Sequence, residues 1–340
     1  MKLKHILPLS LAGLALAACS TDNGKDAPEV TGDAIRFNAS APIAPRNVTT
    51  TENLENFRVT AFVEGKRYMD NVLVTKNGNA WTYTPVMYWP AEEPVNFFSY
   101  SPDDIVQSAT DGTSADLKGF VNSGTTDLLY GVNMDESQKT TKMVKINFRH
   151  ALSQVRFYFR RKSQNPPIRV DVTNVALTQI NSVGDFNFPR TSTSQSSTAQ
   201  GTWTAQAVPT DPVLYADNAT HAVTLTDNGI ELNPDSYYFF IPQKLTAPGE
   251  DYASGAFVKV TCAIYHEGTN TKLWPKEADY SDIYFPLNTD GNGTRSVTEW
   301  LQGRAYVYNI SIGVPSETSS IEFDVTVDEY KDFTETDLEN

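Results

Sequence analysis

The chain has 340 residues and a formal net charge of −14 at pH 7, and its Lys and Arg residues are scattered rather than clustered. This acidic balance argues against nucleic acid or an anionic lipid surface as a partner. The length suffices for two hydrophobic cores.

The first residues have the features of an export signal. Lys2 and Lys4 precede an apolar run over residues 6–16, which has the length of a signal-peptide core and is too short to span a bilayer. The run ends in Leu16-Ala17-Ala18-Cys19, which resembles the lipobox of bacterial lipoproteins. We therefore predict a signal peptide over residues 1–18 and a lipid on Cys19, whose acyl chains would hold the protein at the outer membrane.

A polar tether is expected after the lipidated cysteine. Residues 19–32 are mostly small or polar and lack the apolar groups needed for packing. With Cys19 lipidated, Cys262 has no partner for a disulfide and is predicted to be a core residue of a strand. Apart from the lipid, no cofactor is expected.

Alternating apolar residues predict strands along nearly the whole mature chain. Such runs occupy residues 57–63, 72–74, 95–97, 145–148, 155–159, 306–312 and 321–327, with turn signals such as Asn77-Gly78 between them. Only residues 297–302 are compatible with a short helix. The pattern predicts an all-β sandwich class.

A switch in the alternation marks the predicted domain boundary. The apolar positions are even at Ile146 and Phe148 but odd at Val155 and Phe157. Because neighbouring side chains of a strand face opposite ways, the switch indicates a bulge, a bend, or a strand that passes from one sheet to another. We place the boundary between residues 149 and 150.

This boundary divides the mature chain into an N-terminal sandwich over residues 33–149 and a C-terminal sandwich over residues 150–340. The alternative boundary, Pro166-Pro167, is more typical of a hairpin inside the second domain. Residues 185–204 are rich in Ser and Thr and are predicted to form a long exposed loop.

Sequence motifs for catalysis are absent. Neither Gly-x-Ser-x-Gly, nor His-Glu-x-x-His, nor a P-loop, nor Gly-x-Gly-x-x-Gly occurs. Adjacent carboxylates such as Glu92-Glu93 and Asp103-Asp104 would face opposite ways in a strand, so they suit solvated loops better than an acid–base pair. His150 lies at the predicted junction, where a structural hydrogen bond is favoured. We expect no enzymatic activity.

One segment matches part of a calcium-binding loop. Asn288, Asp290, Asn292 and Glu299 fall at positions 1, 3, 5 and 12 of that template. Position 1 lacks its usual carboxylate, and a strand-like run rather than a helix precedes the segment. A polar hairpin loop is therefore the favoured interpretation and calcium binding the alternative, and the sequence predicts no metal site.

The chain is rich in aromatic residues, among them Tyr83, Tyr88, Trp89, Trp203 and Trp300. Rings exposed on one face would form a stacking platform for sugars, whereas rings in the cores of sandwiches would not. Core positions are favoured. A glycan-binding outer-membrane lipoprotein of a polysaccharide-uptake system stays as the alternative function.

Several short segments carry a family resemblance in their order and spacing. They are residues 34–37, 53–62, 68–72, 81–85, 88–90, 97–102, 148–152, 303–310 and 321–330. Together they resemble the fimbrillin (FimA/Mfa-like) lipoproteins of Bacteroidales. The resemblance covers nearly the whole mature chain, and it implies two tandem transthyretin-like β-sandwiches and a role in type V pili or related adhesion structures.

The resemblance also implies a route of assembly. In that family an Arg-specific protease removes the N-terminal segment of the lipoprotein, and a strand from a neighbouring subunit fills the groove. Here Ile35 and Phe37 would form the removable first strand, and Arg46, in a Pro- and Thr-rich link, would be the processing site. The alternatives are a permanent edge strand and an ordinary loop arginine.

The implied partners are other pilus subunits, the outer membrane through the lipid, and a host or bacterial surface receptor. The C-terminal region departs from the pattern of a stalk subunit. Residues 328–340 are acidic and poor in strand-forming residues, while residues 321–327 would complete the protein's own sandwich. This departure argues against a stalk role and leaves a tip, anchor or accessory role open.

Overall fold

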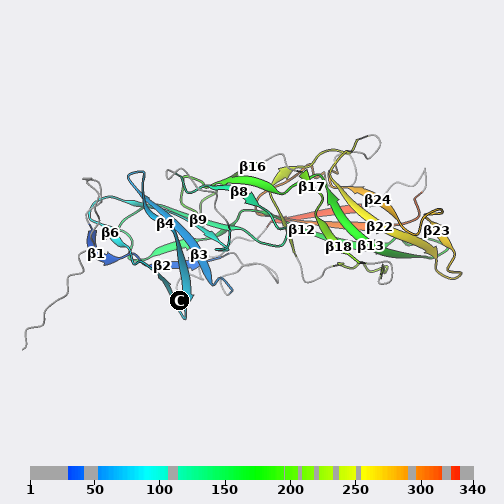
Figure 1. Cartoon of the computed structure of the whole chain (residues 1–340), viewed down its shortest axis with the longest axis horizontal. Helices are drawn as coiled ribbons and strands as arrows, with labels where there is room; N and C mark the ends of the chain where they lie inside the picture. The colour runs from blue at the N-terminus through cyan, green and yellow to red at the C-terminus, as the bar shows by residue number, and fades with distance from the viewer. Residues whose placement is uncertain are drawn as a thin grey trace, which may run out of the picture.

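The chain folds into an elongated all-β molecule, seen in the computed structural model of Figure 1. The structure describes residues 30–41, 53–105, 114–194, 196–205, 209–217, 222–232, 237–249, 254–289, 296–315 and 323–329. None of these residues lies in a helix, which confirms the predicted all-β class. Within the same ranges, no helix is therefore long and apolar enough to cross a membrane.

Eleven of the strands in the described residues precede residue 151. They are β1 (Val30–Ala34), β2 (Phe37–Ser40), β3 (Asn56–Val63), β4 (Lys66–Asn77), β5 (Ala80–Tyr83), β6 (Tyr88–Pro90), β7 (Val95–Ser101), β8 (Leu117–Val121), β9 (Leu129–Glu136), β10 (Val144–Asn147) and β11 (Arg149–His150).

The strands that follow make up the rest of the described chain. They are β12 (Ser153–Arg161), β13 (Ile168–Thr178), β14 (Ile180–Asn181), β15 (Val183–Asn187), β16 (Thr202–Ala205), β17 (Pro209–Thr210), β18 (Val213–Ala216), β19 (Val223–Thr224), β20 (Tyr238–Phe240), β21 (Gln243–Lys244), β22 (Phe257–His266), β23 (Lys272–Trp274), β24 (Ser281–Pro286), β25 (Glu299–Trp300), β26 (Arg304–Ile312) and β27 (Phe323–Glu329). Residues 297–302, which the sequence left compatible with a short helix, contain β25 instead.

The N-terminal sandwich is built on a six-stranded sheet in the order β11-β9-β7-β3-β4-β5. Two small sheets, the parallel pair β2–β10 and the antiparallel pair β1–β6, contribute the opposite side of its core. Phe57, Val59 and Phe97 of the large sheet are buried against Phe37 and Ile146 of the small sheets. This alternation of apolar side chains is the pattern that the sequence shows at residues 57–63.

The C-terminal sandwich has the four-stranded sheet β20-β12-β26-β27 on one side and the sheet around β13 and β22 on the other. Val155 and Phe157 of β12 lie in its core with Val260 and Cys262 of β22. Cys262 is fully buried, as predicted, and burial raises the pKa of its thiol to about 12.

A third sheet, β16-β15-β8, joins the two halves of the chain. It contributes to a core of its own, where Phe62 and Phe98 of the large N-terminal sheet meet Phe186 and Phe188 from beyond residue 150. From Thr60 to Val63, strand β3 is therefore buried on both faces. Figure 1 shows β8 and β16 over the middle of the molecule.

The prediction of one long exposed loop over residues 185–204 is wrong at both ends of the segment, although the described residues between 188 and 201 lie in no strand. This segment contains most of β15 and β16, which pair with each other, and β15 also pairs with β8. Phe186 is fully buried. The abundance of Ser and Thr concealed the few apolar residues that decide the fold here.

The switch in alternation before and after residue 150 corresponds to a change of sheet. Strand β10 pairs with β2 and β11 pairs with β9, whereas β12 runs parallel to β26 in the C-terminal sandwich. The chain thus passes from one sheet to another, which is one of the explanations that the parity allows. Because β8 and β15 connect the halves, the division between residues 149 and 150 stays a prediction.

Candidate functional site

The first strand segment lies at an edge of the N-terminal sandwich. Among the described strands, β2 pairs with β10 alone, and the two run parallel, with Phe37 opposite Val144 and Ala39 opposite Ile146. The amide of Val144 donates to the carbonyl oxygen of Arg36 at 2.8 Å. A single neighbouring strand therefore holds the main chain of β2.

The side chains of this segment nevertheless belong to the core. Ile35 is 1% exposed, Phe37 3%, Ala39 5% and Ala41 0%, while Arg36 between them is exposed. The structure thus brings Ile35 and Phe37 together in one core, as the alternation predicts. We call the space that these four side chains fill the first-strand groove.

The predicted strand over residues 34–38 is divided in two. Strand β1 ends at Ala34 and β2 begins at Phe37. The amide of Ile35 donates to the carbonyl oxygen of Met87 at 2.9 Å, whereas Arg36 bonds toward β10. The chain changes hydrogen-bonding partner between these two residues, and this change interrupts the strand.

Three aromatic rings surround Phe37. The centroids of Phe57, Tyr83 and Phe97 lie 6.1, 5.5 and 5.7 Å from the Phe37 centroid, all in edge-on arrangements. Edge-to-face contacts of this kind stabilise ring pairs beyond the effect of burial. Phe37 is therefore the main anchor of the first strand segment.

The hydroxyl of Tyr83 fixes the main chain next to this anchor. It lies 2.9 Å from the carbonyl oxygen of Ile35 and 3.2 Å from that of Met87, and it accepts a bond from the Met87 amide at 3.3 Å. Burial raises the pKa of Tyr83 above its ordinary value, so the hydroxyl keeps its proton and can donate at neutral pH. Sequence reasoning missed this role because Tyr83 and Ile35 are far apart in the chain.

The other residues predicted for processing and anchoring lie outside the described residues. These are Cys19, with the signal peptide over residues 1–18, and Arg46; only Val30 to Gly32 of the expected tether are described. Arg46 falls in the connection from β2 to β3. These assignments stay predictions.

The structure describes two of the four residues that match the calcium-loop template. Asn288 is buried and its side-chain amide donates to the carbonyl oxygen of Leu245 at 2.9 Å, and Glu299 lies in β25, whereas Asp290 and Asn292 are outside the described residues. Between Asn288 and Glu299, the amide of Thr289 donates to the carbonyl oxygen of Val297 at 2.9 Å. Among the residues with described placement, no group of three or more His, Cys, Asp or Glu is arranged to hold a metal ion.

A buried contact between a histidine and a carboxylate lies where the chain leaves the N-terminal sandwich. Nδ1 of His150 lies 3.1 and 2.9 Å from the two carboxylate oxygens of Asp127, and both side chains are almost fully buried. The sequence predicted a structural hydrogen bond for His150, but nothing in it identified Asp127 as the partner.

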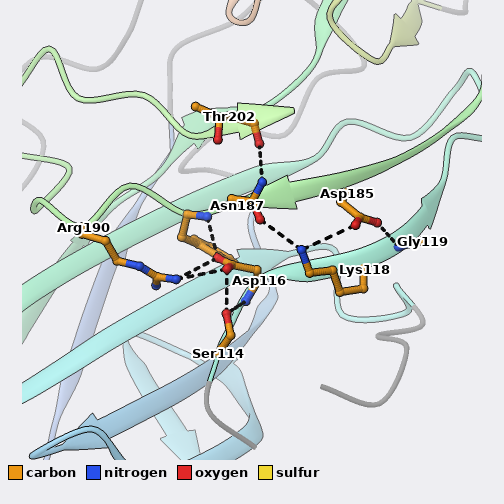
Figure 2. A network of polar contacts seen from close by, with 9 residues as sticks. Ser114, Asp116, Lys118, Gly119, Asp185, Asn187, Arg190 and Thr202 are labelled. Atoms are coloured by element: carbon orange, nitrogen blue, oxygen red, sulfur yellow. Dashed lines mark hydrogen bonds and ion pairs between the residues drawn. The ribbon is translucent and has the colours of Figure 1, made fainter. Parts of the chain in front are cut away.

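A second polar network, shown in Figure 2, ties β8 to the chain around β15. Asp116, which is buried, accepts bonds from the Ser114 hydroxyl at 2.6 Å, the Phe188 amide at 2.9 Å and the Arg190 guanidinium at 3.0 Å. Nearby, Lys118 donates to the side chain of Asn187 at 3.1 Å. Ser114 is a local partner of Asp116, whereas Phe188 and Arg190 come from a distant part of the sequence, and no local motif predicts those two contacts.

Most of the aromatic residues singled out in the sequence are structural. Trp89 and Trp300 are 1% exposed, and Trp300 donates to the Tyr308 hydroxyl at 2.9 Å. Trp203 is half-buried and donates to the Ala151 carbonyl oxygen at 2.7 Å. Of the five residues named, Tyr88 alone is classed as exposed, at 41%. The two buried tryptophans cannot be part of a stacking platform for sugars.

Comparison with known proteins gives one family and a set of solved structures. A family model described as fimbrillin-like matches residues 44–329. No match is found among curated proteins. A fimbrial protein from Bacteroides vulgatus is similar in structure, with a TM-score of 0.58 and 16% identity over 88% of this chain and 99% of that chain, so the two share a fold.

Two further solved structures are more distant. A suggested cell adhesion protein from Bacteroides uniformis has a TM-score of 0.49 and 13% identity, over 88% of this chain and 99% of that one. The fimbrial anchor protein Mfa2 from Porphyromonas gingivalis has a TM-score of 0.36 and 10% identity, with the same two coverages.

Proposed function

Because the chain belongs to the fimbrillin-like family, we propose that it is a cell-surface subunit of a fimbrium or a related adhesin, with a structural and not a catalytic role. The observation that carries this proposal is the first-strand groove. Its occupant, β2, pairs with a single described strand, as an edge strand does, but its side chains Phe37 and Ala39 are buried in the core. Such an element can be replaced by a strand of another subunit without rebuilding the rest of the sandwich.

Removal of the first strand would leave a site with a strong tendency to be refilled. Full burial of a side chain such as Ile35 or Phe37 contributes about 1.5–3 kcal/mol each. The amides of Val144 and Phe148, which donate to the carbonyl oxygens of Arg36 and Ser40, would also lose their acceptors. A strand from a neighbouring subunit would restore both contributions, and this exchange would link one subunit to the next.

Arg46 is the proposed site of the cut that releases the first strand. In the sequence it lies between β2 and β3, so a cut after it would separate β1 and β2 from the other described strands and would interrupt none of them. In this proposal the precursor is exported, held at the outer membrane by the lipid on Cys19, and then cut after Arg46. The mature subunit would begin at Asn47.

A tip, anchor or accessory position suits the protein better than the stalk. Strand β27 pairs with β26 along its whole length, from Phe323 opposite Ile310 to Glu329 opposite Arg304. It is thus committed to the protein's own sheet and is not free to fill the groove of a neighbour while that sheet is intact. The receptor of such a subunit would be a host or bacterial surface molecule.

The N-terminal residue of the protein recovered from cell surfaces tests the processing route. An N-terminus at Asn47 supports cleavage and strand exchange. An N-terminus at a lipidated Cys19 indicates an anchored subunit that keeps its first strand, and this result contradicts the cleavage step. Affinity electrophoresis with soluble polysaccharides provides a check on the function as a whole. Retardation by a glycan would favour the alternative of a glycan-binding lipoprotein.

A further inference from the structure

The first-strand groove is not uniform along its length. At the position of Phe37 it is wide, since the rings of Phe57, Tyr83 and Phe97 leave room for a whole aromatic side chain among them. At the next inward position, Ala39 is only 5% exposed although its side chain is a single methyl group. Neighbouring atoms already cover that methyl group, so a larger side chain would have to displace them.

The glycine at position 131 shows how close the layers are at this narrow end. Gly131 lies in β9, and a Cβ atom built on it would come within 2.5 Å of Cγ2 of Ile146 in β10. Ile146 is the residue opposite Ala39 in the β2–β10 pair. Further along the same segment, Ala41 is completely buried. The groove therefore narrows from Phe37 towards Ala41.

The groove also has a direction. Strand β2 runs parallel to β10, and the Phe148 amide donates to the Ser40 carbonyl oxygen at 2.9 Å, as the Val144 amide does to Arg36. Of the residues between the inward positions, Arg36 is exposed and Asn38 is half-buried, whereas Ser40 is buried and its hydroxyl donates to the side-chain oxygen of Asn147 at 3.3 Å. The shape and the hydrogen bonds together define one orientation and one register for an occupant.

We propose that the first-strand groove selects its occupant by the sizes of alternate side chains. The partner it fits is a strand that runs parallel to β10 and carries a branched aliphatic residue at the position of Ile35, an aromatic residue at that of Phe37, and alanine-sized residues at those of Ala39 and Ala41. This inference rests on the proposed strand exchange and adds the chemistry of the incoming strand. The aromatic position anchors the strand and the two small positions exclude bulky sequences.

The inference can be tested with the full mature chain and synthetic peptides. A site for a highly specific protease is inserted between residues 42 and 52, and the chain is cut there in the presence of a fluorescent peptide of residues 33–41. Unlabelled variants of the peptide then compete for the groove, and the ratio of their dissociation constants is measured. Because only the peptide is altered, no variant can fail through misfolding of the receptor.

Each peptide variant examines one part of the groove. Phe37→Ala removes the ring from its aromatic surroundings and is expected to weaken binding by about a hundredfold. Ala39→Leu is expected to weaken it by about tenfold, because it overfills the narrow end. Arg36→Leu adds the same side chain on the exposed face and serves as the matched control, with an expected change of at most about twofold.

The outcomes separate this inference from the proposed exchange. Equal binding of all peptides would mean that strands exchange but that the groove does not select by size, which overturns the inference alone. If the unaltered peptide does not enter the groove, both the exchange and the inference are wrong. Tighter binding of the Ala39→Leu peptide would also overturn the inference, since it would show that the groove is wide at this position.

Discussion

At the scale of single residues, the Tyr83 hydroxyl holds the link between β1 and β2. Replacement Tyr83→Phe removes the bond to the Ile35 carbonyl oxygen and leaves the ring in place next to Phe37. We expect the free energy of unfolding to fall by about 1 kcal/mol and the amides of residues 35–37 to exchange faster with solvent. Denaturant unfolding and hydrogen exchange measure both effects.

Tyr88→Phe is the matched control, because that side chain is exposed and sits outside the groove. Unchanged exchange at residues 35–37 in Tyr83→Phe would show that the hydroxyl does not hold the first strand. An equal effect of Tyr88→Phe would attribute the result to a general loss of stability.

Asp116 holds the network between the two halves of the chain. Its carboxylate accepts from a hydroxyl, a main-chain amide and the Arg190 guanidinium, so Asp116→Asn places an amide donor where at least one of these bonds needs an acceptor. We expect a loss of about 2 kcal/mol in the free energy of unfolding. Denaturant titration measures this loss. Glu92→Gln breaks the exposed ion pair with Lys139 and serves as the control, which should leave the denaturant midpoint of unfolding unchanged. A midpoint for Asp116→Asn equal to that of the unaltered protein would contradict this role.

The sequence predicts some of these residues and not others for a clear physical reason. Ile35 and Phe37 follow from alternation, which is a local property of one strand. Tyr83, Gly131 and Asp116 act on segments that only the fold brings to them, and no local pattern records such pairs. The positions of Ile35 and Phe37 in the groove were therefore predictable from the sequence, whereas its hydrogen bonds and its narrow end at Ala39 and Ala41 were not.

At the scale of elements, Gly131 controls the spacing between β9 and β10. In Gly131→Ala, the new Cβ atom would meet Cγ2 of Ile146 at 2.5 Å, and β10 would have to move away from the large sheet. We expect a loss of about 1–3 kcal/mol in the free energy of unfolding and faster exchange of the amides of residues 144–148. Thermal or denaturant unfolding and hydrogen exchange test this.

Gly268→Ala is a suitable control for that substitution. A Cβ atom at Gly268 would find its nearest neighbour at 3.5 Å, which is an ordinary contact distance. We expect little change in stability from it. If Gly131→Ala were equally harmless, the layers would be able to separate without cost, and the narrow end of the groove would lose its structural basis.

The polar composition of two strands, β15 and β16, hides them from prediction by sequence. Residues 57–63 and 155–159 were recognised because one face of each strand is apolar and the alternation is visible. Strands β15 and β16 carry few apolar residues among many polar ones, and their burial depends on the aromatic face of β3 and β7 that they cover. A strand that is stabilised mainly by what it covers leaves little signal in its own sequence.

At the scale of the whole molecule, the third core couples the two sandwiches. Phe62 and Phe98 from one half pack there with Phe186 and Phe188 from the other, and each buried ring contributes about 2–3 kcal/mol. If subunits are linked by the proposed strand exchange, a load applied at the first-strand groove would pass to the C-terminal sandwich through these packed side chains and the β8–β15 pairing.

This coupling predicts that both sandwiches unfold in one transition. In a chain that begins at residue 20, Cys262 is the sole cysteine, and its burial, which raises the thiol pKa to about 12, makes it slow to react until the C-terminal sandwich opens. Labelling of Cys262 and hydrogen exchange at β3 and β7 should therefore change at the same denaturant concentration. In Asp116→Ala, which removes the Asp116 contacts of the network in Figure 2, the two transitions should move apart. Separate transitions in the unaltered chain would mean that the sandwiches are independent and that the third core does not join them.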